Sequence, residues 1–269
     1  MTESMSSPSR TGAQAVERAL TVLRALEDSE DPLGVTELAR QTELTLSTAH
    51  RLAKTLTESG LLAQDPITER YQLGPTLVAL GEKAAQRLGY DRVLPLLREL
   101  SAATGESINL GIRTGNDVHV ALHVPSPQPL RFDQPAGTAV PLHVSAMGKC
   151  LLAHVGEIDD QVDGLGNLTR VTDRSITQRN KLKAELELVR QRGWALNDEE
   201  RNPGVRAIAV PVLRDGTAVA AIAVQGPTIR LTEDRLDDIA AQLRSTAQTV
   251  APGLGRKVID QTVSESDPT

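Results

Sequence analysis

Cys150 and His154 are the residues whose types most readily suggest chemistry, because helical spacing would set the thiol beside the imidazole. With His143 just upstream, the pair could serve as a nucleophile with its base or as part of a metal site. The neighbouring sequence supplies no second ligand group and no orienting carboxylate, and a small cysteine on an apolar helix face usually packs inside a core. We therefore predict no catalytic residue, no metal and no cofactor. The alternative is a small-acid enzyme that uses Cys150 and His154.

A second candidate site is the acid-free stretch LTLSTAHRLAKTL (44–56), in a chain that carries 35 Asp and Glu residues against 29 Lys and Arg. Helical spacing turns its leucines and alanines to one face and its polar side chains to the other. Arginine suits guanine edges in the major groove and hydroxyl groups suit phosphates or bases, whereas an acid would be repelled by the phosphates. We predict that this helix reads DNA through Ser47, Thr48, His50, Arg51 and Lys54. The alternative is a solvated helix in a domain that contacts only other proteins.

Two further arginines are candidate DNA contacts. Arg70 follows the Asp65-Pro66 turn, where the wing of a winged helix could reach the backbone or the minor groove. Arg10 lies in an N-terminal segment rich in Ser, Pro and Thr, which is typical of a mobile arm. A net charge of −6 argues against sequence-blind binding, which needs a broad basic surface. Any contact with double-stranded DNA must therefore be local.

The elements that must position these residues can be predicted from the spacing of apolar side chains. Helical spacing begins at Ala13, and a short helix over 36–42 follows with Thr36 as its cap. The helix quoted above comes next, and residues 60–74 favour two short strands around a turn. This order predicts a winged helix-turn-helix.

The rest of the chain alternates between strand and helix patterns. A connecting helix is expected from 76 to 89, and the final helix is expected to be capped by Thr232. Gly193 is placed to end the helix over 178–193. The order of elements favours an α+β sheet domain with helices on one side. The expected strands are SINLGIR, DVHVALHV, RAIAVPVL and TAVAAIAVQG.

The helix expected over 145–155 offers another binding site at its start. Ser145 is its expected cap, so the first-turn N–H groups of Ala146, Met147 and Gly148 would be free. Amide donors and the helix dipole both favour a carboxylate there. The alternative is an ordinary cap that binds nothing.

Composition narrows the class of protein. A single cysteine cannot form an intramolecular disulfide, which suits a reducing compartment. No apolar run is long enough to cross a bilayer, and the first residues lack the apolar core of a signal peptide. No phosphate-binding loop, dinucleotide glycine fingerprint or nucleophile elbow is present in the sequence. We expect a cytoplasmic protein without a membrane partner.

Three segments of the chain resemble the IclR family of bacterial transcriptional regulators. They are the N-terminal pattern from AVERALTVLRAL to YQLG, then VPLHVSAMGKCLLA, and finally LNDEERNPGVRAIAVPV. The three occur in the family's order and spacing over nearly the whole chain. The resemblance implies an α+β fold, with a winged helix joined by a helix to a GAF-like effector domain. We expect a disordered arm (1–12), a winged helix-turn-helix DNA-binding domain (13–75), a linker helix (76–90), an effector-binding domain (91–255) and a disordered tail (256–269).

The resemblance also implies partners and a binding pocket. It implies a palindromic operator, a homodimer that often forms a dimer of dimers, and repression more than activation of nearby genes. The effector would be a small metabolite, commonly one that carries a carboxylate. The family's pocket corresponds to Ala146, Met147, Asn197, Val205 and Ala207, with Phe132 and Val140 as apolar wall. The helix start that includes Ser145 and Gly148 belongs to the same region.

The chain departs from the family's usual pattern at four positions. Asn197 stands where many members have Asp, and Ala207 where many have Cys. Met147 occupies room that a smaller residue would leave. Glu43 replaces the glycine usual in the helix-turn-helix turn, which costs roughly 1 kcal/mol if that position is left-handed.

Overall fold

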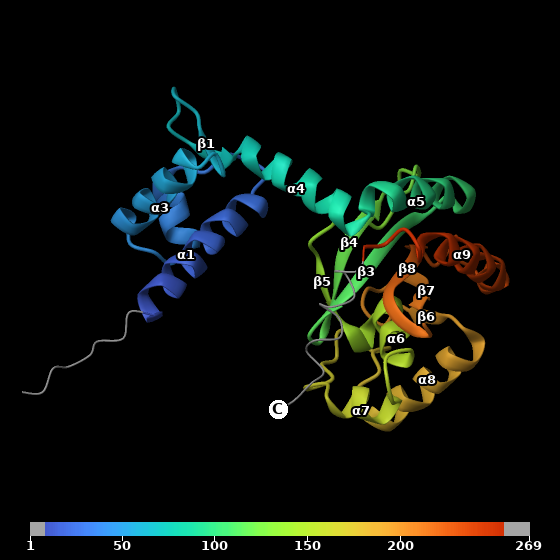
Figure 1. The fold of residues 1–269 in the computed structure, drawn as a ribbon. Helices are drawn as coiled ribbons and strands as arrows, with labels where there is room; N and C mark the ends of the chain where they lie inside the picture. Colours follow the sequence, from blue (N-terminus) through green and yellow to red (C-terminus); the bar gives the residue numbers. More distant parts are fainter. Residues whose placement is uncertain (1–8, 256–269) are drawn as a thin grey trace, which may run out of the picture. The chain divides into compact units, whose positions relative to one another are not determined.

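The structure is a computed structural model that describes residues 9–255. The chain forms two compact units, of which the first ends at Ala84 and the second begins at Ala85 (Figure 1). The division falls inside helix α4 (Pro75–Leu88), which corresponds to the predicted linker helix. The predicted tail and residues 1–8 of the predicted arm lie outside the described residues. The remainder of the arm is not irregular as expected, because α1 already begins at Ser9.

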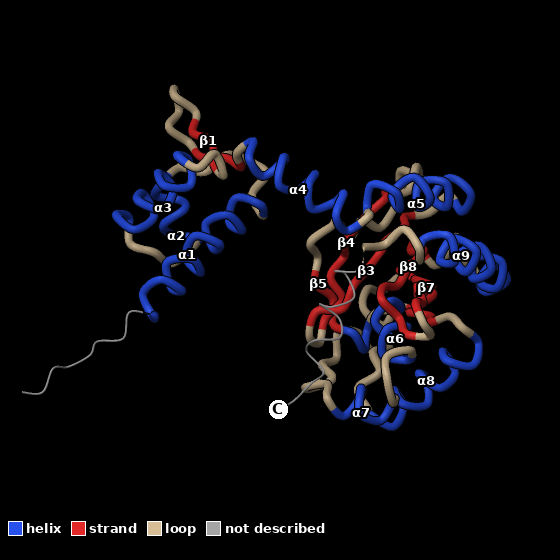
Figure 2. The backbone as a smooth tube through the Cα atoms, viewed as in Figure 1, coloured by secondary structure: helices blue, strands red, loops and turns tan. Residues whose placement is uncertain are grey.

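The first unit is a winged helix-turn-helix, as predicted. Its hairpin is antiparallel, with Leu62 opposite Leu73 (Figure 2). Apolar side chains from the helices and the hairpin form one core, in which Leu38 and Val22 are fully buried. The elements are α1 (Ser9–Glu27), α2 (Val35–Gln41), α3 (Leu46–Glu58), β1 (Leu62–Gln64) and β2 (Tyr71–Leu73).

Two details of the helix-turn-helix involve glutamates. The expected cap of α2, Thr36, is wrong, because the helix starts one residue earlier and Gly34 is its N-cap. The backbone N–H of Gly34 donates to Oε2 of Glu37 at 2.8 Å, which satisfies a donor that Thr36 cannot reach. In the turn before α3, Glu43 has a φ of 54°. That left-handed conformation is unfavourable for a residue with a Cβ atom.

The second unit is an α+β domain built on a six-stranded antiparallel sheet. The strand order is β5-β4-β3-β8-β7-β6, so the two predicted strand pairs form its centre. The short edge strands β5 and β6 and the short helix α7 were not predicted. The elements are α5 (Tyr90–Thr104), β3 (Ser107–Thr114), β4 (Asp117–Val124), β5 (Ala139–Pro141), α6 (Ala146–Ala153), α7 (Ile158–Asp163), α8 (Arg179–Arg192), β6 (Ala195–Asp198), β7 (Val205–Arg214), β8 (Thr217–Pro227) and α9 (Leu236–Val250).

Helices cover both faces of this sheet, so the expectation of helices on one side is wrong. On one face α5 and α9 lie side by side and pack on the bulky side chains of the strands (Figure 1). On the other face α6, α7 and α8 pack on small side chains, chiefly alanines. In β7, for example, Ile208 and Val210 belong to the first core and Ala209 to the second. A strand that is buried on both faces shows no alternation between polar and apolar residues. The sequence therefore does not indicate that a second layer of helices covers the small-residue face.

The predicted helix ends of the second unit agree with the structure in two places. Ser145 caps α6, and Gly193 ends α8 in the left-handed conformation with a φ of 78°. Thr232 begins a short 3-10 turn, Glu233–Arg235, rather than α9 itself. Within residues 9–255, none of the helices combines the length and apolarity that a bilayer span requires.

Candidate DNA-binding and effector sites

Helix α3 presents the predicted polar face to solvent. Thr45 is its N-cap, and the Thr45 hydroxyl accepts a hydrogen bond from the backbone N–H of Thr48 at 3.3 Å. Behind this face, Ala49, Ala53 and Leu56 are buried in the core of the first unit. The polar set is exposed apart from Thr48, which is half-buried, and it comprises Ser47, Thr48, His50, Arg51 and Lys54.

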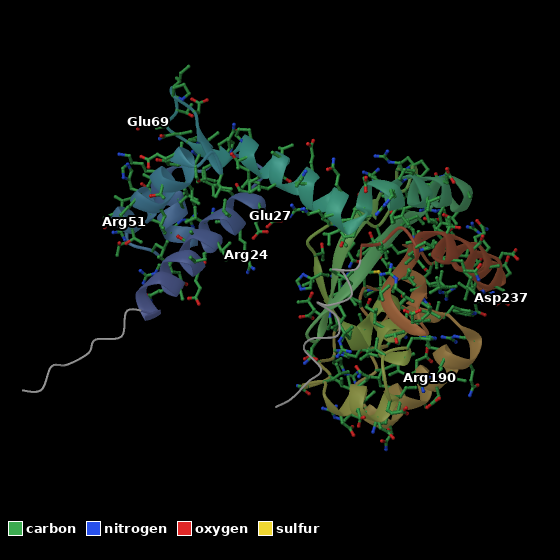
Figure 3. All side chains as sticks on the ribbon, in the orientation of Figure 1. Arg24, Glu27, Arg51, Glu69, Arg190 and Asp237 are labelled. Carbon is green, nitrogen blue, oxygen red and sulfur yellow. The ribbon has the colours of Figure 1, made fainter. Side chains whose placement is uncertain are left out.

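The cations of α3 are available to an external partner. Figure 3 labels Arg51 on the exposed side of α3, and neither the His50 nor the Arg51 side chain forms a hydrogen bond or ion pair with the described residues. Lys54 lies 4.0 Å from Glu58 one turn later, and both side chains are 67% exposed. Such an exposed pair contributes little and leaves the ammonium group free to exchange partners.

Unlike the cations of α3, the side chain of Arg70 is engaged in an ion pair within the first unit. Its guanidinium donates to both carboxylate oxygens of Glu37, with a shortest distance of 2.9 Å. The pair joins the end of the hairpin loop to α2, and the same Glu37 carboxylate accepts from the Gly34 N–H. In this structure Arg70 therefore links the hairpin to α2. The side chain of Arg10, the other predicted arginine, lies outside what the structure describes.

A pocket in the second unit gathers nearly all the predicted effector residues. It encloses about 380 Å³ of space, counting its open mouth. It lies between the start of α6, the small-residue face of the sheet and the segments that follow β4 and β6. The predicted residues that line it are Phe132, Val140, Ser145, Ala146, Met147, Asn197, Val205 and Ala207.

Gly148 is the exception, and its N–H group is not free as predicted. That N–H donates to the Ser145 hydroxyl at 3.3 Å, which completes the cap. A Cβ atom at Gly148 would lie 2.2 Å from the carbonyl oxygen of Leu142, so the glycine allows close backbone packing outside the pocket. The N–H groups of Ala146 and Met147 have no acceptor within residues 9–255. Two donors at the helix start thus face the pocket.

Strand register explains which residues form the floor. Asn197 pairs with Ala207 across β6 and β7, and Ala207 pairs with Gln225 across β7 and β8. Directly paired residues project to the same face of a sheet, so the three side chains form a row. Gln225 was missed because this row joins residues far apart in sequence. The other lining residues that sequence reasoning missed are Gln134, Val144, Arg201, Asn202 and Ala223.

Asn197 is occupied by structural hydrogen bonds. Its amide Nδ2 donates to the carbonyl oxygen of Val144 at 2.6 Å, and its Oδ1 accepts from the backbone N–H of Glu200 at 3.0 Å. An ionised Asp at this position could not donate to the Val144 carbonyl. The amide therefore links the start of α6 to the loop after β6. This link explains why Asn can stand where many family members have Asp.

The bulk of Met147 is matched by a glycine on the facing strand. A Cβ atom at Gly111 of β3 would lie 2.8 Å from Sδ of Met147. The Met147 thioether therefore occupies space that the side chain of any residue other than glycine at position 111 would fill. Met147 lies against the sheet instead of closing the pocket.

An ion pair lies behind the pocket. Nζ of Lys149 is 2.5 Å from Oε1 of Glu200 and 3.8 Å from Oε1 of Glu185, and Lys149 is only 1% exposed. Burial raises the pKa of Glu200, while the nearby ammonium group of Lys149 opposes that shift. Because Glu200 directly precedes Arg201 in the loop after β6, the pair holds one wall of the pocket. Burial also lowers the pKa of the Arg201 guanidinium.

Cys150 and His154 do not form a reactive pair. The Cys150 thiol is fully buried and donates to the carbonyl oxygen of Ala209 at 3.2 Å, and burial raises its pKa to about 12. Nδ1 of His154 lies 3.0 Å from the backbone oxygen of Cys150, and no hydrogen bond joins the imidazole to the sulfur within residues 9–255. A thiol that keeps its proton is a poor nucleophile and a poor ligand. No group of three or more potential metal ligands occurs among the described residues.

A winged helix with an exposed basic helix, followed by an α+β domain with a pocket, defines a two-domain transcriptional regulator. Comparison with known protein families supports this assignment to transcriptional regulators. Residues 15–66 match the IclR helix-turn-helix domain, and residues 90–251 match the domain described as bacterial transcriptional regulator IclR C-terminal. The chain belongs to the IclR family.

Individual relatives support the same assignment. The HTH-type transcriptional regulator BhcR of Paracoccus denitrificans is 36% identical over 90% of this chain and 88% of its own length. The HTH-type transcriptional repressor AllR of Escherichia coli is 32% identical over 91% and 92% of the two chains. The crystal structure of the Thermotoga maritima IclR superposes with a TM-score of 0.77 at 26% identity, covering 90% of this chain and 99% of that chain.

These comparisons confirm the predicted family, fold class and function. The protein is a DNA-binding transcriptional regulator with a C-terminal effector domain, and it is not an enzyme. The alternative based on Cys150 and His154 is therefore wrong, in agreement with the burial of the thiol.

Proposed function

We propose that this chain is a cytoplasmic repressor whose operator binding is controlled by a small carboxylate bound in the pocket at the start of α6. The observation that carries the proposal is the pocket itself. It joins two unused N–H donors, at Ala146 and Met147, to a half-buried Arg201 and to a floor of small side chains. Amide donors at a helix start favour a carboxylate.

On the DNA side, we propose that α3 enters the major groove with its first turn foremost. Arg51 would contact base edges, while Ser47, Thr48, His50 and Lys54 would contact phosphates or bases. The proposed assembly is a homodimer on a palindromic operator, with a dimer of dimers as the larger form. Two copies of α3 would then occupy successive major grooves.

The two sites would be coupled through the equilibrium between two arrangements of the assembly. An effector shifts that equilibrium only by the difference in its affinity for the two arrangements. Helix α4 (Pro75–Leu88) continues from one unit into the other, which makes it the proposed route of transmission.

The DNA-binding part is tested by gel shift on the region upstream of the protein's own gene. Arg51→Ala is expected to weaken specific binding by about 1–3 kcal/mol, the usual value of one good base contact. Arg24→Ala is a matched control, because Arg24 is also exposed in the first unit but lies on α1 (Figure 3). Binding by Arg51→Ala that equals that of the parent would show that α3 is oriented wrongly in the proposal.

The pocket is tested through Ser145→Trp. A tryptophan at the helix start would fill the pocket, so release from the operator by small carboxylates should be lost while operator binding persists. An unchanged dose–response curve would remove the α6 start from the effector site. Because the chain is a DNA-binding regulator of this family, the alternative of a winged helix that contacts only other proteins is not retained.

A further inference from the structure

The pocket contains unsatisfied donors at a second place, away from the start of α6. Gln134 and Gln225 are 5% and 4% exposed, and the Nε2 atom of each is buried without a hydrogen-bond partner. Both residues line the pocket. A buried amide donor without an acceptor costs about 1–3 kcal/mol, so an acceptor from a bound molecule would recover that loss.

Arg201 supplies a positive charge to the same pocket. Its neighbours along the chain have partners of their own, since Glu200 pairs with Lys149 and Asp198 with Arg206. Arg201 forms no hydrogen bond or ion pair with the described residues, and no Asp or Glu side chain lines the pocket. An amide can donate or accept, but a guanidinium only donates, so the three side chains together favour an anion.

The strand register separates Gln225 from the helix start. Asn197 and Gln225 stand two strands apart in the row that crosses Ala207, and Asn197 bonds to Val144 beside the start of α6. Neighbouring strands lie about 4.8 Å apart, so the two ends of the row are about 10 Å apart. The middle of the row is a methyl group, which leaves an apolar gap between two polar ends.

We propose that the effector is a short dicarboxylate that spans this row. One carboxylate would accept from the N–H groups of Ala146 and Met147, and the other from Arg201, Gln134 and Gln225. Hydrogen bonds of about 2.9 Å at each end leave room for only a few carbon atoms between the carboxylates. This inference rests on the proposed function, since it specifies the effector of the same pocket.

The test is isothermal titration calorimetry of the full-length protein without DNA, using malonate, succinate, glutarate and adipate. Butyrate is the matched control for succinate, because it has the same chain length and one carboxylate. Propionate, valerate and hexanoate are the corresponding controls for malonate, glutarate and adipate. At least one dicarboxylate is expected to bind ten times more tightly than the monocarboxylate of the same chain length. Arg201→Gln should remove that preference, while Arg170→Gln, an equal change of charge outside the pocket, should keep it. Gln225→Leu should weaken the same binding and serves as the second variant if Arg201→Gln does not fold.

Equal affinities for dicarboxylates and monocarboxylates would overturn the inference and leave the proposed carboxylate-controlled repressor standing. Binding of no dicarboxylate, or a preference that survives Arg201→Gln and Gln225→Leu, would overturn it too. Failure of the proposed function would be detected in a different experiment. The gel shift with Arg51→Ala measures DNA binding and involves no ligand.

Discussion

The ammonium group of Lys149 lies 2.5 Å from Oε1 of Glu200, and both residues are buried behind the pocket. The other carboxylate oxygen of Glu200, Oε2, is buried without a partner. The backbone carbonyl of Glu200 also accepts from the Ser175 hydroxyl at 2.7 Å, which anchors the loop from a second side. The Glu200 carboxylate, held so far from water, depends on Lys149 as its close counter-ion.

Lys149→Met should therefore destabilise the effector domain strongly. Removing one partner of a buried pair leaves the other charge uncompensated, and such changes cost about 3–5 kcal/mol. Urea unfolding followed by circular dichroism measures the loss. Lys183→Met is the control, because Lys183 pairs with Asp159 and Asp163 at the surface, where ion pairs contribute at most about 1 kcal/mol. Similar losses in the two variants would contradict the role given to Lys149.

The buried thiol of Cys150 predicts a specific loss of stability at alkaline pH. In the folded chain burial raises the pKa of this thiol to about 12, against 9.0 for an exposed thiol. Above pH 9 the unfolded chain releases a proton that the folded chain retains, so stability falls as pH rises. Between pH 8 and pH 10 the parent should lose about 1.4 kcal/mol more than Cys150→Ala. Parallel pH profiles of unfolding free energy would show that the thiol is accessible.

Glu43 predicts a stabilising substitution in the helix-turn-helix. Its φ of 54° is costly for a residue with a Cβ atom, so Glu43→Gly should raise the unfolding free energy of the first unit by about 1 kcal/mol. Glu43→Ala separates strain from charge, because it removes the carboxylate and keeps the Cβ atom. A gain in the alanine variant equal to that in the glycine variant would assign the effect to charge.

The pair of Arg70 and Glu37 predicts a minor role for Arg70 in reading DNA. The two side chains are 38% and 41% exposed, so a double-mutant cycle with alanine should give a coupling of at most about 1 kcal/mol. That coupling should shrink in high salt. In gel shifts, Arg70→Ala should lower operator affinity less than Arg51→Ala does. Equal losses would mean that Arg70 leaves Glu37 and contacts the operator.

The features that sequence reasoning predicted well are local. Ser145 as a cap and Gly193 as a helix end depend on residues within one turn, and the structure agrees with both. The polar face of α3 also follows from spacing alone. The short edge strands were missed because three or four residues, as in β5 and β6, are too few to show a period.

The features that sequence reasoning missed depend on long-range pairing. Gln225 and Arg201 join the pocket only because β6, β7 and β8 are neighbours in a fixed register. The contact of Arg70 with Glu37 likewise joins residues 33 positions apart. The family resemblance found the apolar and backbone part of the pocket, whereas Gln134, Arg201 and Gln225 were found only in the structure.

The small side chains under α6 have an evolutionary consequence. Ala207 and Ala223 line the pocket, and the sheet's bulky residues face α5 and α9 on the opposite side. An enlargement at Ala207, which is only partly buried, would reshape the chamber without entering the core, whereas Ala223 is buried in the core beneath α6. Descendants of this scaffold can therefore acquire new metabolite preferences in small genetic steps, without first having to repair their fold.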